Sequence, residues 1–180
     1  KTVNQAQFHF KVSLFNNRKI NIAGDLNDDH NLFTICKNID AYFDNPLKKA
    51  LKDDPSSTVI KIEMGQAEFV ARRDNFVHII KFISRVFRKS RSRKVWKNAQ
   101  LVSHFNLNTV KPLALIEDYW FFIRIKSYVI YEYINGTTLK DFFSDPTITE
   151  PEKEKTAAQV VQTMNSWHAF GISHGDPKAS

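Results

Sequence analysis

The sequence predicts an α+β fold in which a mainly antiparallel sheet is followed by helices. Apolar and polar residues alternate over residues 8–14, and two runs rich in strand-forming residues occupy 58–64 and 67–73. Apolar residues recur at helical spacing over 76–87. A helix-capping pattern at Thr149 opens a segment with one apolar stripe, which predicts a long helix.

The remaining elements follow from the same patterns and from the turn residues between them. Before residue 76 they are, in order, a strand at 8–14, a turn at Asn16-Asn17, a return strand at 19–22, a loop at 24–30, one or two helices at 32–51 interrupted near Pro46, a break at 53–57, and strands at 58–64 and 67–73 joined at Gly65-Gln66. From residue 76 onward the sequence predicts helices at 76–87 and 94–105, separated by a basic break at 89–93. Strands follow at 112–116 and 128–134, with a strand or connecting arm at 119–125 between them. A turn at Asn135-Gly136, a short helix capped by Thr137 or Thr138, and the long helix that ends at Gly171 complete the chain.

The composition suits a globular protein with one core: 42% of the 180 residues are hydrophobic and the formal net charge is +7. The charge favours an anionic partner such as phosphate, nucleic acid or an anionic membrane surface. The single cysteine, Cys36, excludes an internal disulfide and is expected to be a buried thiol. No apolar stretch reaches the roughly 18 residues that a membrane span requires.

The segment with the clearest chemistry is His174-Gly175-Asp176-Pro177-Lys178, directly after the long helix. A carboxylate at Asp176 can orient a substrate hydroxyl and accept its proton, and Lys178 can neutralise charge on a transferring phosphoryl group. Taken alone, the tripeptide His-Gly-Asp is more typical of a helix end followed by a solvated turn. Its context therefore decides how it is interpreted.

That context resembles the kinase-like phosphotransferases, because the segment follows Tyr131-Glu132-Tyr133-Ile134-Asn135-Gly136 at a similar distance. Four further segments narrow the resemblance by their order and spacing: FVARRDN at 69–75, FRKSRSR at 87–93, WKNA at 96–99 and VKPLALIE at 110–117. Together they look like the lipopolysaccharide kinase family, which phosphorylates Kdo or heptose of the inner core. The resemblance covers residues 58–180.

The resemblance implies a protein-kinase-like fold and three regions. Residues 1–54 would be an N-terminal extension without an assigned role, 55–134 an antiparallel-sheet N-lobe, and 135–180 the hinge exit and the start of a helical C-lobe that ends in the catalytic loop. The implied enzyme uses ATP and Mg²⁺ and acts on a lipopolysaccharide core sugar. It would be cytoplasmic, with peripheral contact on the inner face of the bacterial inner membrane.

The resemblance also assigns roles to single residues. Asp176 would be the catalytic base and Lys178 a stabiliser of phosphate charge. Arg72 stands where the family usually has a strand lysine that contacts the ATP phosphates. The hinge that receives the adenine would consist of Glu132, Tyr133 and Ile134.

Three departures from the family pattern bear on activity. Arginine at position 72 keeps the charge of lysine but presents a planar fork instead of a point charge. Val95 falls where some members place a helix glutamate that pairs with that lysine, so no ion-pair partner can be named, and Glu63 or Glu68 on the hairpin could substitute. The sequence ends at Ser180, before the expected metal-binding asparagine and Asp-Phe-Gly-type segment. No metal ligand can be assigned in it, and the chain as printed is expected to be inactive, whatever a longer parent does.

Other functions stay open at this point. A Ser/Thr protein kinase or an aminoglycoside- or choline-type kinase would share the chemistry and differ in the acceptor. A non-catalytic pseudokinase is favoured by Arg72 and Val95. A nucleic-acid-binding domain is suggested by charge alone, and no helix-turn-helix, zinc or RNA-binding signature supports it, so no nucleic-acid partner is expected.

Ten of the basic residues fall within 72–97, against the single acidic Asp74. Such a run is usually a solvated helix face, but a basic amphipathic helix can also lie on an anionic membrane. We expect substrate or lipid phosphates to be contacted by Arg85, Arg88, Arg91 and Arg93. The aromatic run 119–122 fits a membrane or substrate contact, although a buried strand is favoured, and Trp96 and Trp167 are expected in the core.

Overall fold

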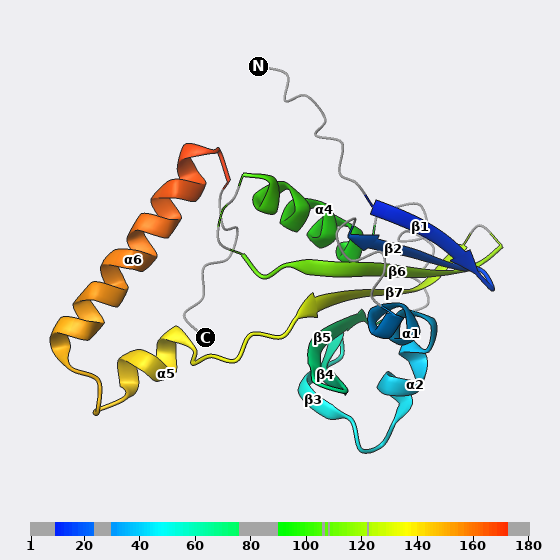
Figure 1. Ribbon diagram of the computed structural model, residues 1–180, viewed down its shortest axis with the longest axis horizontal. Coiled ribbons are helices and arrows are strands. Elements are labelled where there is room, and N and C mark those ends of the chain that lie inside the picture. The colour runs from blue at the N-terminus through cyan, green and yellow to red at the C-terminus, as the bar shows by residue number, and fades with distance from the viewer. Residues whose placement is uncertain are drawn as a thin grey trace. The chain divides into compact units, whose positions relative to one another are not determined.

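The computed structural model describes residues 10–23, 30–75, 90–105, 107, 109–121 and 123–172. The helix expected at 76–87 and the segment that contains Asp176 and Lys178 lie outside the described residues. The predicted α+β class is confirmed, because the chain forms an antiparallel seven-stranded sheet accompanied by helices (Figure 1). The sheet order is β1-β2-β6-β7-β5-β4-β3.

The strands are β1 (Phe10–Phe15), β2 (Arg18–Ala23), β3 (Lys49–Asp54), β4 (Ser57–Met64), β5 (Ala67–Asp74), β6 (Pro112–Trp120) and β7 (Ile123–Glu132). The helices are α1 (His30–Lys37), α2 (Ile39–Asp44), α4 (Arg91–His104), α5 (Leu139–Ser144) and α6 (Glu150–Ala169). The chain divides into two compact units, one with residues 1–104 and 109–133 and one with 105–108 and 134–180. The sheet lies entirely in the first unit.

Several boundaries differ from the expected ones, and two of them concern the sheet edge and α4. The helical run expected at 32–51 ends with α2, and Lys49–Asp54 is strand β3, which pairs with β4 along the sheet edge. Pairing with β4 overrides the weak strand preference of this charged segment. The basic break expected at 89–93 is too long, because α4 already begins at Arg91, where the Ser90 hydroxyl accepts the Arg93 backbone N–H at 2.8 Å.

The first 54 residues, which the sequence left without a role, supply part of the sheet and of the core. Strand β2 pairs with β6, and β1 pairs with β2. Residues of α1 and α2, among them Cys36 and Phe43, pack with Ile20 and Ile130 in one buried cluster. Cys36 is fully buried, as expected.

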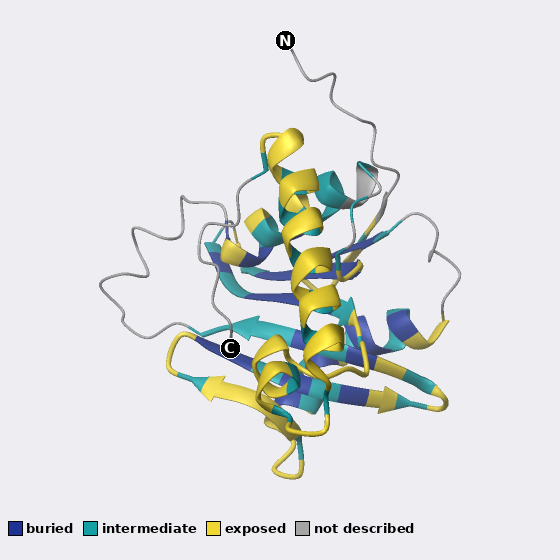
Figure 2. Cartoon of the chain, turned by 90° about the vertical axis from the view of Figure 1, so that its left-hand side faces the viewer, coloured by how far each residue is buried: buried dark blue, intermediate teal, exposed yellow. Residues whose placement is uncertain are grey.

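The sheet is covered by different helices on its two faces. Helices α1 and α2 contribute to the cluster that contains Ile130, whereas Trp96 of α4 packs with Leu115 and Val129. Neighbouring residues of a strand point to opposite faces of the sheet. Helices α1 and α2 therefore cover the face that contains Ile130, and α4 covers the face that contains Val129. Figure 2 shows the buried residues concentrated along the sheet. Trp96 is 5% exposed, which confirms its expected place in the core.

In the second unit, capping residues define where the helices begin. Thr138 caps α5 by accepting the Asp141 backbone N–H at 3.1 Å, which decides between the two threonines. The capping box of Thr149 and Glu152 at the start of α6 is confirmed. Gly171 ends this segment with φ +71°, a conformation that glycine adopts without strain. No described helix is long and apolar enough to cross a bilayer.

Candidate functional site

Arg72 lies on β5 on the face of the sheet that α4 covers. It pairs with Val129 of β7, and directly paired residues of antiparallel strands share a face. Val129 packs against Trp96 of α4, so the Arg72 side chain lies on the α4 side. The side chain is 21% exposed, and its Nε atom is buried without a hydrogen-bond partner among the described residues. The Arg72 guanidinium is therefore held beside the sheet with its Nε–H donor unpaired among the described residues.

Asp74, two residues further along the same strand, is the acidic partner of Arg72. Its Oδ1 lies 3.5 Å from a terminal nitrogen of the Arg72 guanidinium. Its Oδ2 accepts the Ser92 backbone N–H at 2.9 Å, the Ser92 hydroxyl at 2.8 Å and the Ser127 hydroxyl at 3.2 Å. A carboxylate at the start of a helix also interacts favourably with the helix dipole. Asp74 thus links Arg72 to the first turn of α4.

The expected substitution of Glu63 or Glu68 for a helix glutamate is wrong. Glu63 pairs with Lys49 at 2.9 Å and Glu68 with Lys61 at 2.6 Å. Glu68 is four residues from Arg72 along β5, which places the two residues about 13 Å apart at the rise of an extended strand. Helix α4 contains no acidic residue, so the carboxylate beside Arg72 comes from the strand itself.

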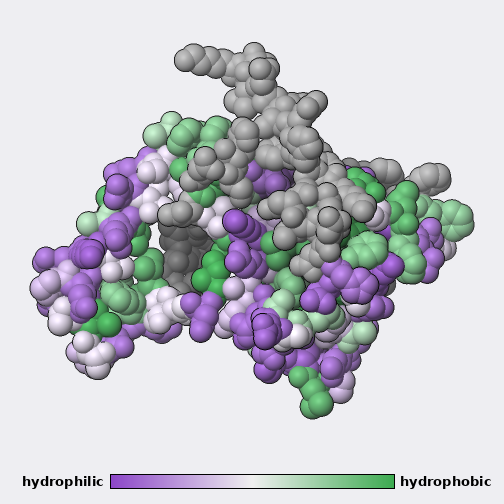
Figure 3. Space-filling view, in the orientation of Figure 1, coloured by the Kyte–Doolittle hydropathy of each residue, from purple (hydrophilic) through white to green (hydrophobic). Residues whose placement is uncertain are grey.

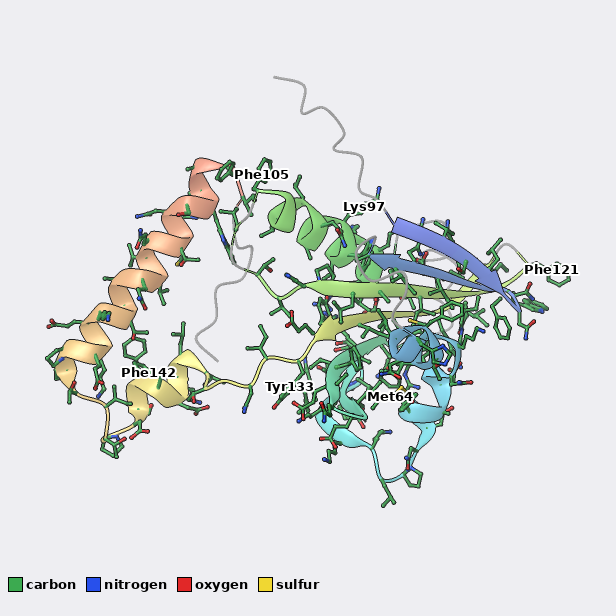
Figure 4. The ribbon with its side chains drawn as sticks, viewed as in Figure 1. Met64, Lys97, Phe105, Phe121, Tyr133 and Phe142 are labelled. Atoms are coloured by element: carbon green, nitrogen blue, oxygen red, sulfur yellow. The ribbon has the colours of Figure 1, made fainter. Side chains whose placement is uncertain are left out.

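The expected hinge leaves the sheet at the end of β7 (Figure 4, Tyr133). The backbone N–H of Glu132 donates to the Lys111 carbonyl at 3.2 Å, and that of Tyr133 donates to the Glu68 carbonyl at 3.3 Å. Within the described part of the chain, the Ile134 N–H has no backbone acceptor, and Ile134 is 59% exposed. Of the three expected hinge residues, Ile134 therefore retains a backbone donor for a ligand.

Two further side chains on this side of the sheet were not singled out from the sequence. Lys61 of β4 lies with its ammonium 4.0 Å from the centre of the Tyr133 ring. Tyr131 of β7 packs against the cluster of Trp96 and Val129, and burial raises its pKa to about 12, with Asp74 contributing and Arg72 opposing. The alternation of polar and apolar residues along β4 and β7 does not indicate which face of the sheet a ligand would approach. The sequence therefore could not identify Lys61 and Tyr131 as residues of the candidate site.

Glu117 of β6 is a fully buried carboxylate beside the start of α4. It accepts hydrogen bonds from the Ser90 hydroxyl at 2.9 Å, from the Tyr119 hydroxyl at 3.1 Å and from Arg93. Burial, and then the charge of Glu117, raises the pKa of Tyr119. Arg93 was expected to contact substrate or lipid phosphates, but it is paired with Glu117 within the protein.

The other expected site residues are distributed as follows. Arg91 is exposed on the first turn of α4. Arg85, Arg88, Asp176 and Lys178 lie outside the described residues. Over the described ranges, no group of three His, Cys, Asp or Glu residues is placed to hold a metal ion. The structure therefore brings together Arg72, Asp74 and Tyr131, and no Mg²⁺ ligand set can be named from them.

No known protein family, no curated protein and no solved structure matches this chain. The arrangement of the chain's own residues is therefore the basis for the function proposed below.

Proposed function

We propose that the chain is the nucleotide-binding part of an ATP-dependent phosphotransferase of protein-kinase-like fold, whose acceptor is a Kdo or heptose hydroxyl of the lipopolysaccharide inner core. The observation that carries the proposal is the position of Arg72, a partly unsatisfied cation on the α4 side of β5, beside the strand that leads to the segment Glu132–Ile134. The order of elements along the chain, from antiparallel sheet through α5 and α6 to His174-Gly175-Asp176, supports it.

Each residue would contribute through position and charge. Bound ATP would supply the phosphoryl group. The Arg72 guanidinium, kept in place by Asp74, would neutralise phosphate charge, since charge-assisted hydrogen bonds to phosphate are among the strongest that proteins form. The Ile134 N–H would donate to the base. Asp176 would orient the acceptor hydroxyl and accept its proton, and Lys178 would offset charge on the transferred group.

Two adjacent arginines allow a controlled test of nucleotide binding. Arg73 follows Arg72 on β5 but lies on the opposite face, with its guanidinium 4.9 Å from the centre of the Phe43 ring. Titration of the chain with a fluorescent ATP analogue should show at least about tenfold weaker binding for Arg72→Gln, since hydrogen bonds to charged groups contribute about 1.5–3 kcal/mol. Arg73→Gln should change the affinity by less than about twofold. Equal effects of the two variants would contradict the proposed nucleotide site.

Transfer itself is tested on a protein in which the chain is joined to a complete kinase-like C-lobe. Labelled phosphate from the γ position of ATP should appear on a Kdo- or heptose-containing acceptor, and Asp176→Asn should abolish the transfer. Unchanged transfer by that variant would remove Asp176 from the mechanism. Transfer to a protein serine or to an aminoglycoside instead would support the phosphotransferase activity but show that the acceptor is not a lipopolysaccharide sugar.

A second candidate is a nucleotide-binding pseudokinase. It is favoured by the absence of any acidic residue on α4 and by arginine in place of lysine at position 72. It predicts ATP binding that depends on Arg72 without phosphoryl transfer to an acceptor. The Arg72→Lys variant discriminates the two, because a catalytic site should tolerate the restored lysine and retain transfer.

A further inference from the structure

The turn between β6 and β7 exposes two large aromatic side chains. Trp120 is 61% exposed and Phe121 is 79% exposed. The burial expected for residues 119–122 is therefore wrong for Trp120 and Phe121: β6 continues to Trp120, but this residue is exposed, and Phe121 lies in the turn to β7. Figure 4 shows the Phe121 side chain projecting beyond the strand ends. The rings of Trp120 and Phe121 contact each other edge to face, with centres 5.4 Å apart.

This turn uses residues that are unfavourable for its geometry. Trp120 pairs with Ile123, so the turn falls between these two residues, and Phe121 within it has φ +53°. Positive φ strains a bulky side chain, and hairpins of this length normally place asparagine or glycine there. The hairpin of β1 and β2 follows that rule, with Asn16 and Asn17 at φ +46° and +64°. A strained turn that keeps exposed aromatic residues indicates a requirement other than folding.

The neighbouring hairpin adds apolar surface to the same end of the sheet. The Asn17 carbonyl accepts the Tyr119 backbone N–H at 2.9 Å, which holds the two turns together. Leu14, just before that turn, is 80% exposed, and Phe15 is 43% exposed. In Figure 3 hydrophobic surface, drawn green, reaches the right-hand edge, where Figure 4 labels Phe121. We define the hairpin end as Leu14, Phe15, Trp120 and Phe121.

Among the described residues near the hairpin end, the charges without an oppositely charged partner are basic. The acidic residues Asp40, Glu117 and Asp118 are each paired with arginine or lysine. Lys37 lies 5.1 Å from the centre of the Phe15 ring. Lys19 follows the first hairpin turn on β2, and among the described residues neither it nor Lys37 has an acidic partner. An exposed apolar end flanked by lysines that have no acidic partner in the described part of the chain complements an anionic bilayer.

We propose that the hairpin end docks on an anionic phospholipid bilayer, with Trp120 and Phe121 entering the interfacial region and Lys19 and Lys37 at the headgroup phosphates. Tryptophan is enriched at this depth because its ring is apolar and its N–H can still find a polar partner. The surface is distinct from the basic segment 72–97, and docking does not require phosphoryl transfer. The ten-residue strand β7 separates it from Glu132 by about 30 Å, so docking would leave the candidate nucleotide site accessible.

The test compares binding of the whole chain to vesicles of phosphatidylcholine with and without phosphatidylglycerol. We expect sedimentation with the mixed vesicles only, weakened by salt, together with a blue shift of tryptophan fluorescence that Trp120→Phe removes. Phe121→Asn should lower the partition coefficient about tenfold, since burying a phenylalanine side chain contributes about 1.5–3 kcal/mol. Lys19→Gln with Lys37→Gln should weaken binding and flatten its salt dependence.

Phe121→Asn also separates docking from a structural role, because asparagine suits the turn. Its thermal unfolding temperature should equal or exceed that of the original chain. The matched control is Leu47→Asn, which removes an 87% exposed apolar side chain from the loop after α2 and should leave vesicle binding unchanged. Binding unaffected by Phe121→Asn, or equal binding to neutral vesicles, would overturn the proposal. So would a dimer in vesicle-free solution that Phe121→Asn converts to monomer, because the surface would then be an interface between copies of the chain.

Discussion

The Asp74 carboxylate lies 3.5 Å from the Arg72 guanidinium and, through its other oxygen, accepts the backbone N–H of Ser92 at 2.9 Å. One side chain thus sets the position of a strand cation and the start of α4. In the kinase-like interpretation, Asp74 supplies from the strand the negative charge that α4 lacks. Arg72 and Asp74 are two residues apart on β5, so their side chains lie on the same face of the sheet. The proximity of these two side chains therefore does not depend on how α4 packs.

Replacement of Asp74 by asparagine should therefore affect both stability and nucleotide binding. An amide keeps one acceptor oxygen but loses the charge that holds Arg72 and complements the helix dipole. We expect a loss of about 1–3 kcal/mol in the free energy of unfolding, measured by urea denaturation. Binding of the ATP analogue should weaken as well. The control is Asp44→Asn, whose side chain is 68% exposed and faces Arg73; a similar loss in that variant would contradict a special role of Asp74.

Prediction from sequence succeeded where the local pattern and the tertiary packing agree. The β4–β5 hairpin and the capping box at Thr149 and Glu152 require only nearby residues, and both are present. Strand β3 was missed because its sequence, KALKDD, carries charges at positions that face solvent at the sheet edge. No periodicity distinguishes such a strand from a polar helix end.

The candidate site was harder to predict because its members depend on long-range register. Asp74, Ser92 and Ser127 are far apart in the sequence, and only the pairing of β5 with β7 and the packing of α4 bring them together. The same limit applies to Trp120 and Phe121, whose aromatic character favoured a buried strand. Neither hydrophobicity nor strand propensity indicates that a turn falls between Trp120 and Ile123.

The buried ion pair of Glu117 and Arg93 should show strong coupling. Glu117→Gln leaves the Arg93 guanidinium beside a neutral, fully buried partner, and breaking such a pair typically costs about 3–5 kcal/mol. The Arg93 side chain is 29% exposed and can partly reach water, so we expect the lower end of that range. A double-mutant cycle with Arg93→Gln measures the coupling by urea denaturation. Additive effects of the two substitutions would show that the pair contributes no interaction of its own.

Stability should fall in acid because of Asp40. Burial alone would raise its pKa, but hydrogen bonds from Lys126, Tyr128 and Arg18 outweigh burial and lower the pKa to about 2. A carboxyl whose pKa is lower in the folded than in the unfolded chain stabilises the fold at pH values above its unfolded-state pKa, which is near 3.8. That contribution, at most about 2 kcal/mol, is lost as the pH falls through 3.8 toward about 2.

The measurement is urea denaturation between neutral pH and pH 2. The Asp40→Asn variant should be less stable at neutral pH, and its stability should fall less steeply in acid than that of the original chain. Tyr128→Phe removes the hydroxyl that donates to Asp40 at 2.7 Å, so it should raise the pKa of Asp40 and move the acid-induced loss to higher pH. An acid profile unchanged by both substitutions would exclude Asp40 as its source.

The start of α6 provides a prediction confined to the second unit. The Thr149 backbone N–H donates to the Glu152 carboxylate at 2.9 Å, and the two residues form a reciprocal capping box. None of the residues of α6 is buried, so the helix depends more than α4 does on its own capping and on local side-chain pairs. Thr149→Ala should destabilise the helix by about 1 kcal/mol and speed amide hydrogen exchange in its first two turns. Glu150→Gln, which removes the charge of an 80% exposed side chain paired with Lys153, should cost at most about 0.5 kcal/mol. If both variants exchange alike, the capping box does not determine where α6 begins.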